Sequence, residues 1–112
     1  MNITIEKRDG ISLLNIGEER IDAHNSQQLK EFLLQQLEQG DKQLVVQLEK
    51  VRFMDSSGLG ALLVGHKNAL LKSGDLKLAN MQPQVLSMFE LTRLNRVFEI
   101  YANADEALAA AQ

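Results

Sequence analysis

The sequence predicts an α/β domain in which crossover α-helices join the strands of a mixed, mostly parallel β-sheet that opens with an N-terminal β-hairpin. Two observations predict this class. Strand-like and helix-like apolar patterns alternate along the chain after the hairpin, as in folds whose parallel strands are joined by helices. The length of 112 residues suits one domain, residues 1–112, and an apolar content of 45% supports a packed core.

The opening of the chain predicts a hairpin and then a helix. Segment 3–16 alternates apolar and polar residues around an Asp9-Gly10 turn, which is typical of two antiparallel strands. Apolar residues then repeat at helical spacing over 29–37. Asn25 or Ser26 is placed to cap that helix, because both side chains accept hydrogen bonds from free backbone N–H groups.

The centre of the chain predicts a buried strand followed directly by a long helix. The apolar, β-prone run from Leu44 to Met54 stops at Asp55, and its first part is apolar on both faces, as in a central strand covered by helices. A helix-patterned run continues to Leu71. Its expected buried face carries Leu59, Leu62, Leu63, His66 and Leu70.

The last third predicts two more strands and two short helices. Residues 76–79 form an apolar strand, and Pro83 suits the first turn of a helix because proline lacks the N–H that this turn leaves free. Residues 97–101 read as a last short strand. Asn103 is placed to cap a final helix over 105–111.

Composition excludes several classes of partner. The net charge is −3 and Lys and Arg are scattered, so neither nucleic acid nor an anionic membrane surface is expected as a partner. The chain has no Cys, which excludes disulfides and thiolate chemistry and fits a cytoplasmic protein. Its apolar runs are too short to span a bilayer, and its first residues lack the pattern of a signal peptide.

The segment from Val51 to Gly60, Val-Arg-Phe-Met-Asp-Ser-Ser-Gly-Leu-Gly, carries the strongest functional signal. It places the hydroxyl of Ser56 where a strand gives way to a helix. The N-terminal end of a helix has free backbone N–H groups and a partial positive charge, so it tolerates an added phosphate. A phosphorylation site is therefore chemically reasonable at this junction.

This segment resembles the phosphorylation loop of the anti-sigma factor antagonists, the single-domain STAS proteins of bacterial partner-switching systems. The resemblance covers nearly the whole chain and is most specific over 53–60. A second match is Ile21-Asp22, which is similar to the Leu-Asp that follows the second strand in the family. The chain departs from the family by having Glu19 and Arg20 where a glycine is frequent.

The resemblance implies a single STAS domain and a set of site residues. The serine directly after the Asp is phosphorylated in the family, which implies Ser56 here, and the Asp that matches Asp22 borders that serine and contacts the kinase. The implied partner-binding residues are Asp22, Asp55, Ser56, Ser57, Gly58, Leu59 and Gly60.

Each of these residues also has a purely structural interpretation. Ser56 is able to cap the helix, although we expect Ser57 to be the structural cap and Ser56 the phosphoacceptor. Asp55 either caps or rigidifies the turn, or it orients the Ser56 hydroxyl. Gly58 and Gly60 either permit tight backbone geometry or let a partner approach closely.

Other candidate sites are weaker. Asp22 has an alternative interpretation as a solvated loop carboxylate. His24 and His66 lack metal-ligand spacing, so no metal site is expected, and His66 is most simply a half-buried helix residue. No nucleophile–base arrangement, P-loop or dinucleotide-binding glycine pattern is visible, so the chain is not expected to be an enzyme.

The resemblance implies an anti-sigma factor antagonist that works as a switch. Unphosphorylated, it would bind a serine kinase that is also an anti-sigma factor, and phosphorylation of Ser56 would release it until a serine phosphatase resets the switch. No cofactor is expected, because ATP and Mg²⁺ would belong to the kinase. The alternative is a non-catalytic STAS subunit of a larger lipid-transport or stress-signalling assembly.

Overall fold

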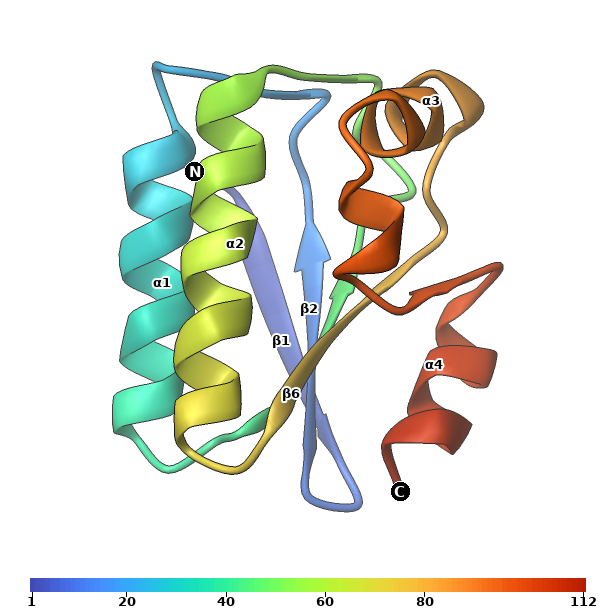
Figure 1. The fold of residues 1–112 in the computed structure, drawn as a ribbon. Coiled ribbons are helices and arrows are strands. Elements are labelled where there is room, and N and C mark those ends of the chain that lie inside the picture. The colour runs from blue at the N-terminus through green and yellow to red at the C-terminus, as the bar shows by residue number, and fades with distance from the viewer.

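The computed structural model describes all residues 1–112 and contains a five-stranded sheet in the strand order β1-β2-β4-β6-β7. β1 and β2 are antiparallel, and every other neighbouring pair in this sheet is parallel (Figure 1). This confirms the predicted α/β fold with an opening hairpin. The strands are β1 (Ile3–Arg8), β2 (Ile11–Ile16), β4 (Gln43–Gln47), β6 (Asp75–Ala79) and β7 (Ile100–Tyr101).

Helices cover both faces of this sheet. α1 and α2 lie side by side on one face, and α4 lies on the other (Figure 1). No helix is both long enough and apolar enough to cross a membrane. The helices are α1 (Ser26–Glu38), α2 (Ser56–Leu71), α3 (Pro83–Leu91), the 3₁₀ helix η1 (Leu94–Arg96) and α4 (Ala104–Ala111).

Strand β4 is central, as its apolar pattern predicted. Leu44 and Val46 belong to the main core of 20 buried residues, which the helices of one face help to form. Val45 points to the opposite face and joins a smaller core of six buried residues, which includes Leu108 of α4. The strand is therefore buried on both faces, because each face is covered by helices.

A second, two-stranded sheet lies beyond the carboxyl end of the main sheet. Its parallel strands are β3 (Arg20–Ile21) and β5 (Phe53–Met54). The sequence analysis treated 44–54 as one apolar run, but β4 ends at Gln47 and the chain turns before β5 begins. Ile21 and Met54 point into the main core, at 0% and 1% exposure, so Arg20 and Phe53 point outward.

Two details of the predicted elements are wrong. Leu70 was expected on the buried face of α2, but its exposure is 53%, and the helix packs instead through small residues such as Gly65 and Ala69. A Cβ on Gly65 would lie 2.7 Å from Leu33 Cδ1, which shows how closely α2 approaches α1. The last strand was expected from Val97, but it spans only Ile100–Tyr101, because the chain turns over residues 97–99 after η1 ends at Arg96.

An ionic cluster around the buried Lys77 lies at the amino ends of β6 and β7. Lys77 is only 6% exposed, and its Nζ donates to Asp75 Oδ2 at 2.6 Å and to Glu99 Oε2 at 2.8 Å. Tyr101 Oη donates to Glu99 Oε1 at 3.0 Å. Burial acts to lower the pKa of Lys77, but the hydrogen bonds to the two carboxylates outweigh it, and the pKa is raised above its ordinary value.

Candidate functional site

The parallel pairing of β3 and β5 brings two distant loops together at one edge of the molecule. Arg20 pairs with Phe53 and Ile21 with Met54, and both strands end at this second pair. The Asp55 N–H donates to the carbonyl oxygen of Ile21 at 3.2 Å. The loop that begins at Asp22 and the start of α2 therefore leave this small sheet side by side.

Asp55 is the N-cap of α2. Its Oδ1 accepts hydrogen bonds from Ser57 N at 3.0 Å, Gly58 N at 3.2 Å and Ser57 Oγ at 2.6 Å. The bond from the Ser57 hydroxyl, opposed by partial desolvation and helped by backbone N–H groups, holds the pKa of Asp55 below its ordinary value of 3.8. The expectation that Ser57 caps the helix is wrong, because its hydroxyl donates to the capping carboxylate.

The two serines of the turn therefore differ in exposure and in hydrogen bonding. Ser56 is the first helical residue and is exposed, and it takes no part in the hydrogen bonds around Asp55. Ser57 is half-buried, and its hydroxyl already donates to Asp55. Of the two hydroxyl groups, that of Ser56 is the more exposed and makes no hydrogen bond to Asp55.

The two glycines of the turn differ in the same way. A Cβ on Gly58 would lie 2.7 Å from Met54 Cγ and 2.9 Å from the Ile21 carbonyl oxygen, so this glycine lets α2 rest against the β3–β5 pair. A Cβ on Gly60 would meet nothing within 4 Å. Leu59 is only 6% exposed. Gly58 and Leu59 therefore face the interior, whereas Gly60 leaves open space at the surface.

Asp22 is held in a turn that leads into α1. Its Oδ1 accepts from His24 N at 3.0 Å, and its backbone N–H donates to Asn25 Oδ1 at 2.9 Å. Asn25 occupies the N-cap position of α1 but makes no side-chain cap bond to the helix, because its oxygen serves this turn. The bond from His24 N, opposed by partial desolvation, holds the pKa of Asp22 below its ordinary value.

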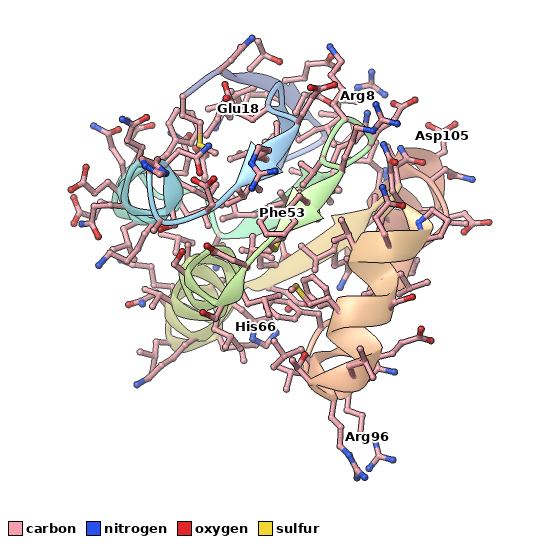
Figure 2. The ribbon with its side chains drawn as sticks, turned by 90° about the horizontal axis from the view of Figure 1, so that it is seen from above. Arg8, Glu18, Phe53, His66, Arg96 and Asp105 are labelled. Atoms are coloured by element: carbon pink, nitrogen blue, oxygen red, sulfur yellow. The ribbon has the colours of Figure 1, made fainter.

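Arg20 and Phe53 form an outward-facing pair beside these loops, and the sequence analysis gave neither a role. The Arg20 guanidinium carbon lies 4.2 Å from the centroid of the Phe53 ring, and Arg20 Nε donates to Asp22 Oδ2 at 3.4 Å. Phe53 is 40% exposed and lies near the centre of the molecule seen from above (Figure 2). Successive side chains of a strand point to opposite faces, so Arg20 and Phe53 point outward because their neighbours Ile21 and Met54 are buried.

A shallow groove runs between the first turns of α1 and α2, next to the Ser56 turn. It is open at Gly60 because that residue has no side chain, and Lys30 contributes a cation from α1. The groove is lined by Ser26, Gln27, Lys30, Ser57, Gly60, Ala61 and Val64.

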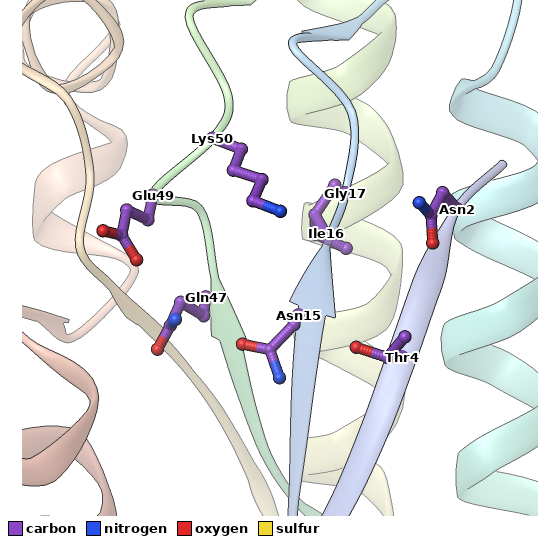
Figure 3. Close-up of a pocket in the computed structure, with 8 residues that line it drawn as sticks. All are labelled: Asn2, Thr4, Asn15, Ile16, Gly17, Gln47, Glu49 and Lys50. Carbon is purple, nitrogen blue, oxygen red and sulfur yellow. The ribbon is translucent and has the colours of Figure 1, made fainter.

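Other polar features lie apart from the predicted site residues. A polar pocket on the sheet, into which the Lys50 side chain extends from the segment after β4, contains none of them (Figure 3). It is lined by Asn2, Thr4, Asn15, Ile16, Gly17, Gln47, Glu49 and Lys50.

Neither histidine makes a recorded contact with the side chain of Ser56. His66 packs edge-on against Phe98, with the ring centroids 5.0 Å apart, and its Nε2 is 3.6 Å from Asp75 Oδ1. It lies ten residues after Ser56 in α2, which is about 15 Å along the helix. The His24 side chain is 94% exposed. No group of three or more His, Asp or Glu side chains is placed to hold a metal ion.

Comparison with known proteins decides the family. The model of the family described as the STAS domain matches residues 2–107. The chain belongs to the STAS domain family. The resemblance seen in the sequence is thus confirmed for the domain as a whole, and the Ser56 turn is a feature of a STAS fold.

Two relatives and one solved structure show what this STAS domain is similar to. BtrV of Bordetella bronchiseptica, named as a candidate anti-sigma factor antagonist, is 31% identical over 99% of this chain and 94% of its own length. The anti-sigma-B factor antagonist of Bacillus subtilis is 30% identical over 94% of each chain. The structure of phosphorylated SpoIIAA from Bacillus shares the fold, with a TM-score of 0.75 and 21% identity over 99% of this chain and 100% of that chain.

Proposed function

We propose that this STAS protein is an anti-sigma factor antagonist controlled by phosphorylation of Ser56. Unphosphorylated, it binds a serine kinase that also acts as an anti-sigma factor, and the phosphorylated form is released. The observation that carries the proposal is the contrast between the two serines: Ser56 is exposed, whereas the Ser57 hydroxyl donates to Asp55 at 2.6 Å. The names of the relatives and the phosphorylated state of a Bacillus protein with this fold support it.

The switch would act through local charge. A phosphate adds about −1.5 to −2 charges and three acceptor oxygens. At Ser56 it would join two carboxylates, Asp55 in the cap and Asp22 in the neighbouring loop. Because Asp55 already accepts the N–H groups of Ser57 and Gly58, the phosphate gains little from the helix end. Its charge would project into the contact surface and oppose binding.

The contact surface that we propose combines direct and indirect contributions. Asp22, Ser56 and Gly60 face the surface and would contact the kinase, with the groove between α1 and α2 beside them. Gly58 and Leu59 would act by fixing the start of α2 against β3 and β5, because both are buried. Asp55 and Ser57 would hold the turn in shape through their hydrogen bonds.

The protein would be the substrate of this cycle and not its catalyst. The kinase would supply ATP and Mg²⁺, and a separate serine phosphatase would remove the phosphate. In the protein itself, the carboxylate nearest to Ser56 in sequence, Asp55, caps the helix with a lowered pKa, which makes it a weak base.

The test is a titration of defined forms against the serine kinase encoded nearest to the gene in its host. Fragment-ion mass spectrometry after incubation with this kinase and ATP should place one phosphate on Ser56, and Ser57→Ala, the matched control, should be modified as well. Calorimetry should show that Ser56→Ala binds like the unmodified protein, and that the phosphorylated form binds at least about tenfold more weakly, or about 1.4 kcal/mol.

Two outcomes would overturn the proposal. Phosphate found chiefly on Ser57 would move the site, and equal affinities of the phosphorylated and unmodified forms would remove the switch. In the second case the protein would act as a non-catalytic STAS subunit of a larger assembly. Ser56→Asp alone is a weak test, because a carboxylate carries less charge than a phosphate.

A further inference from the structure

Arg20 is a cation that two weak contacts hold beside the Ser56 turn. Its Nε lies 3.4 Å from Asp22 Oδ2, and its guanidinium carbon lies 4.2 Å from the centroid of the Phe53 ring. The Arg20 side chain is 62% exposed. Exposed ion pairs of this kind contribute little stability, so Arg20 can change partner at small cost.

The helix end offers a phosphate on Ser56 few free backbone N–H groups. The carboxylate of Asp55 already accepts the N–H groups of Ser57 and Gly58, as well as the Ser57 hydroxyl. The Leu59 N–H donates to the Asp55 carbonyl oxygen. A dianion placed beside this carboxylate therefore needs a cation from another element.

The register of the small sheet places Arg20 within reach. Asp22 and Asp55 follow the paired residues Ile21 and Met54, so the guanidinium at Asp22 lies near the level of Asp55. Ser56 follows Asp55 directly as the first residue of α2, on the segment next to the one that carries Arg20, and neighbouring strands of a sheet lie ~4.8 Å apart. Arg20 points outward from β3, and Ser56 is exposed at the start of α2.

We propose that Arg20 is the intramolecular receiver of the Ser56 phosphate, and that on phosphorylation it leaves Asp22 and Phe53 to pair with the phosphate oxygens. The guanidinium fork matches phosphate geometry and binds it through two N–H groups, which favours the phosphate over a single exposed carboxylate. The exchange leaves Asp22 without its cation and uncovers the Phe53 ring. The modification thereby reshapes the neighbouring loop as well as the turn that carries it. This inference rests on the proposed modification of Ser56.

The experiment installs phosphoserine at position 56 of the full chain by genetic encoding, so no kinase is required. ³¹P NMR then measures the second pKa of the phosphate in the wild type, Arg20→Gln and Arg52→Gln. Arg52 is the matched control, since it is an exposed arginine next to β5 whose Nη1 lies 3.9 Å from Glu19.

We expect Arg20 to lower the pKa of the phosphate by roughly half a unit or more. The phosphate pKa should therefore be higher in Arg20→Gln than in the wild type, and unchanged in Arg52→Gln. The ring protons of Phe53 should shift on phosphorylation in the presence of Arg20 and not in Arg20→Gln. Equal pKa values in the wild type and Arg20→Gln, or equal rises in both arginine variants, would overturn the inference. Neither result depends on a kinase, so failure of the proposed switch would be seen separately in the calorimetric titration.

Discussion

The charged groups near the two ends of α2 differ in how firmly they are paired and how deeply they are buried. At its start, Ser56 is exposed, and Arg20 beside Asp22 is held by weak contacts. Toward its end, where His66 lies near Asp75, the buried Lys77 bonds to two carboxylates. The polar groups at the far end stabilise the fold, whereas those at the start remain available to a partner. Three sets of substitutions test this contrast.

Lys77→Met should give the largest effect. It leaves the half-buried Asp75 and the exposed Glu99 close together without their cation, and loss of one partner from a largely buried ion pair is destabilising. We expect the free energy of unfolding to fall by about 3 kcal/mol in urea titrations. The matched control is Lys7→Met, which removes a lysine that is 54% exposed and paired with Asp41, and should cost less than about 1 kcal/mol. Equal losses in the two variants would contradict the contrast.

Gly58→Ala and Gly60→Ala separate the inward and outward sides of the Ser56 turn. The new Cβ at position 58 would lie 2.9 Å from the Ile21 carbonyl oxygen, so we expect a loss of about 1–3 kcal/mol in unfolding free energy. The new Cβ at position 60 meets no neighbour, and alanine favours the helix by roughly 0.5–1 kcal/mol. Thermal unfolding should therefore shift in opposite directions. A stable Gly58→Ala variant would show that α2 does not depend on this close approach.

Asp55→Asn should give the smallest effect, a loss of stability near neutral pH that shrinks as the pH falls into the acid range. The pKa of Asp55 is below 3.8 in the folded protein, so its carboxylate stabilises the fold above that value, and the stability is lost as the pH falls through the folded-state pKa. Asparagine also caps helices but does not titrate. The free energy of unfolding should therefore decrease less between about pH 5 and about pH 3 in Asp55→Asn than in the wild type. Parallel curves for the two proteins would rule out this role of Asp55.

The sequence predicted those parts of the fold that depend on local pattern. The Asp9-Gly10 hairpin and the switch from strand to helix at Asp55 are visible as alternation followed by helical spacing. The buried face of α2 was misjudged at Leu70 because that face is built from small residues, which an apolar pattern does not single out. The cap was misjudged because Asp55 and Ser57 both carry suitable oxygens. Only the geometry shows that Asp55 is the acceptor.

The candidate site was predictable only in part. The Ser56 turn is local, and Asp22 was named through a family resemblance. The pairing of β3 with β5 joins strands of two residues each, which carry almost no pattern of their own. The contact of Arg20 with Phe53 depends on that pairing, so no local signal showed that the two side chains meet. The functional assignments of the site residues themselves remain predictions.

The separation of the β3–β5 pair from the main sheet has a consequence for how such proteins diversify. Ile21 and Met54 anchor the pair to the core, whereas Arg20 and Phe53 face outward and contribute little to it. Substitutions at the outward positions would therefore change the surface beside the Ser56 turn without disturbing the fold. In a bacterium that carries several copies of this domain, a few different side chains on the β3–β5 pair would be able to keep each copy specific for its own partner.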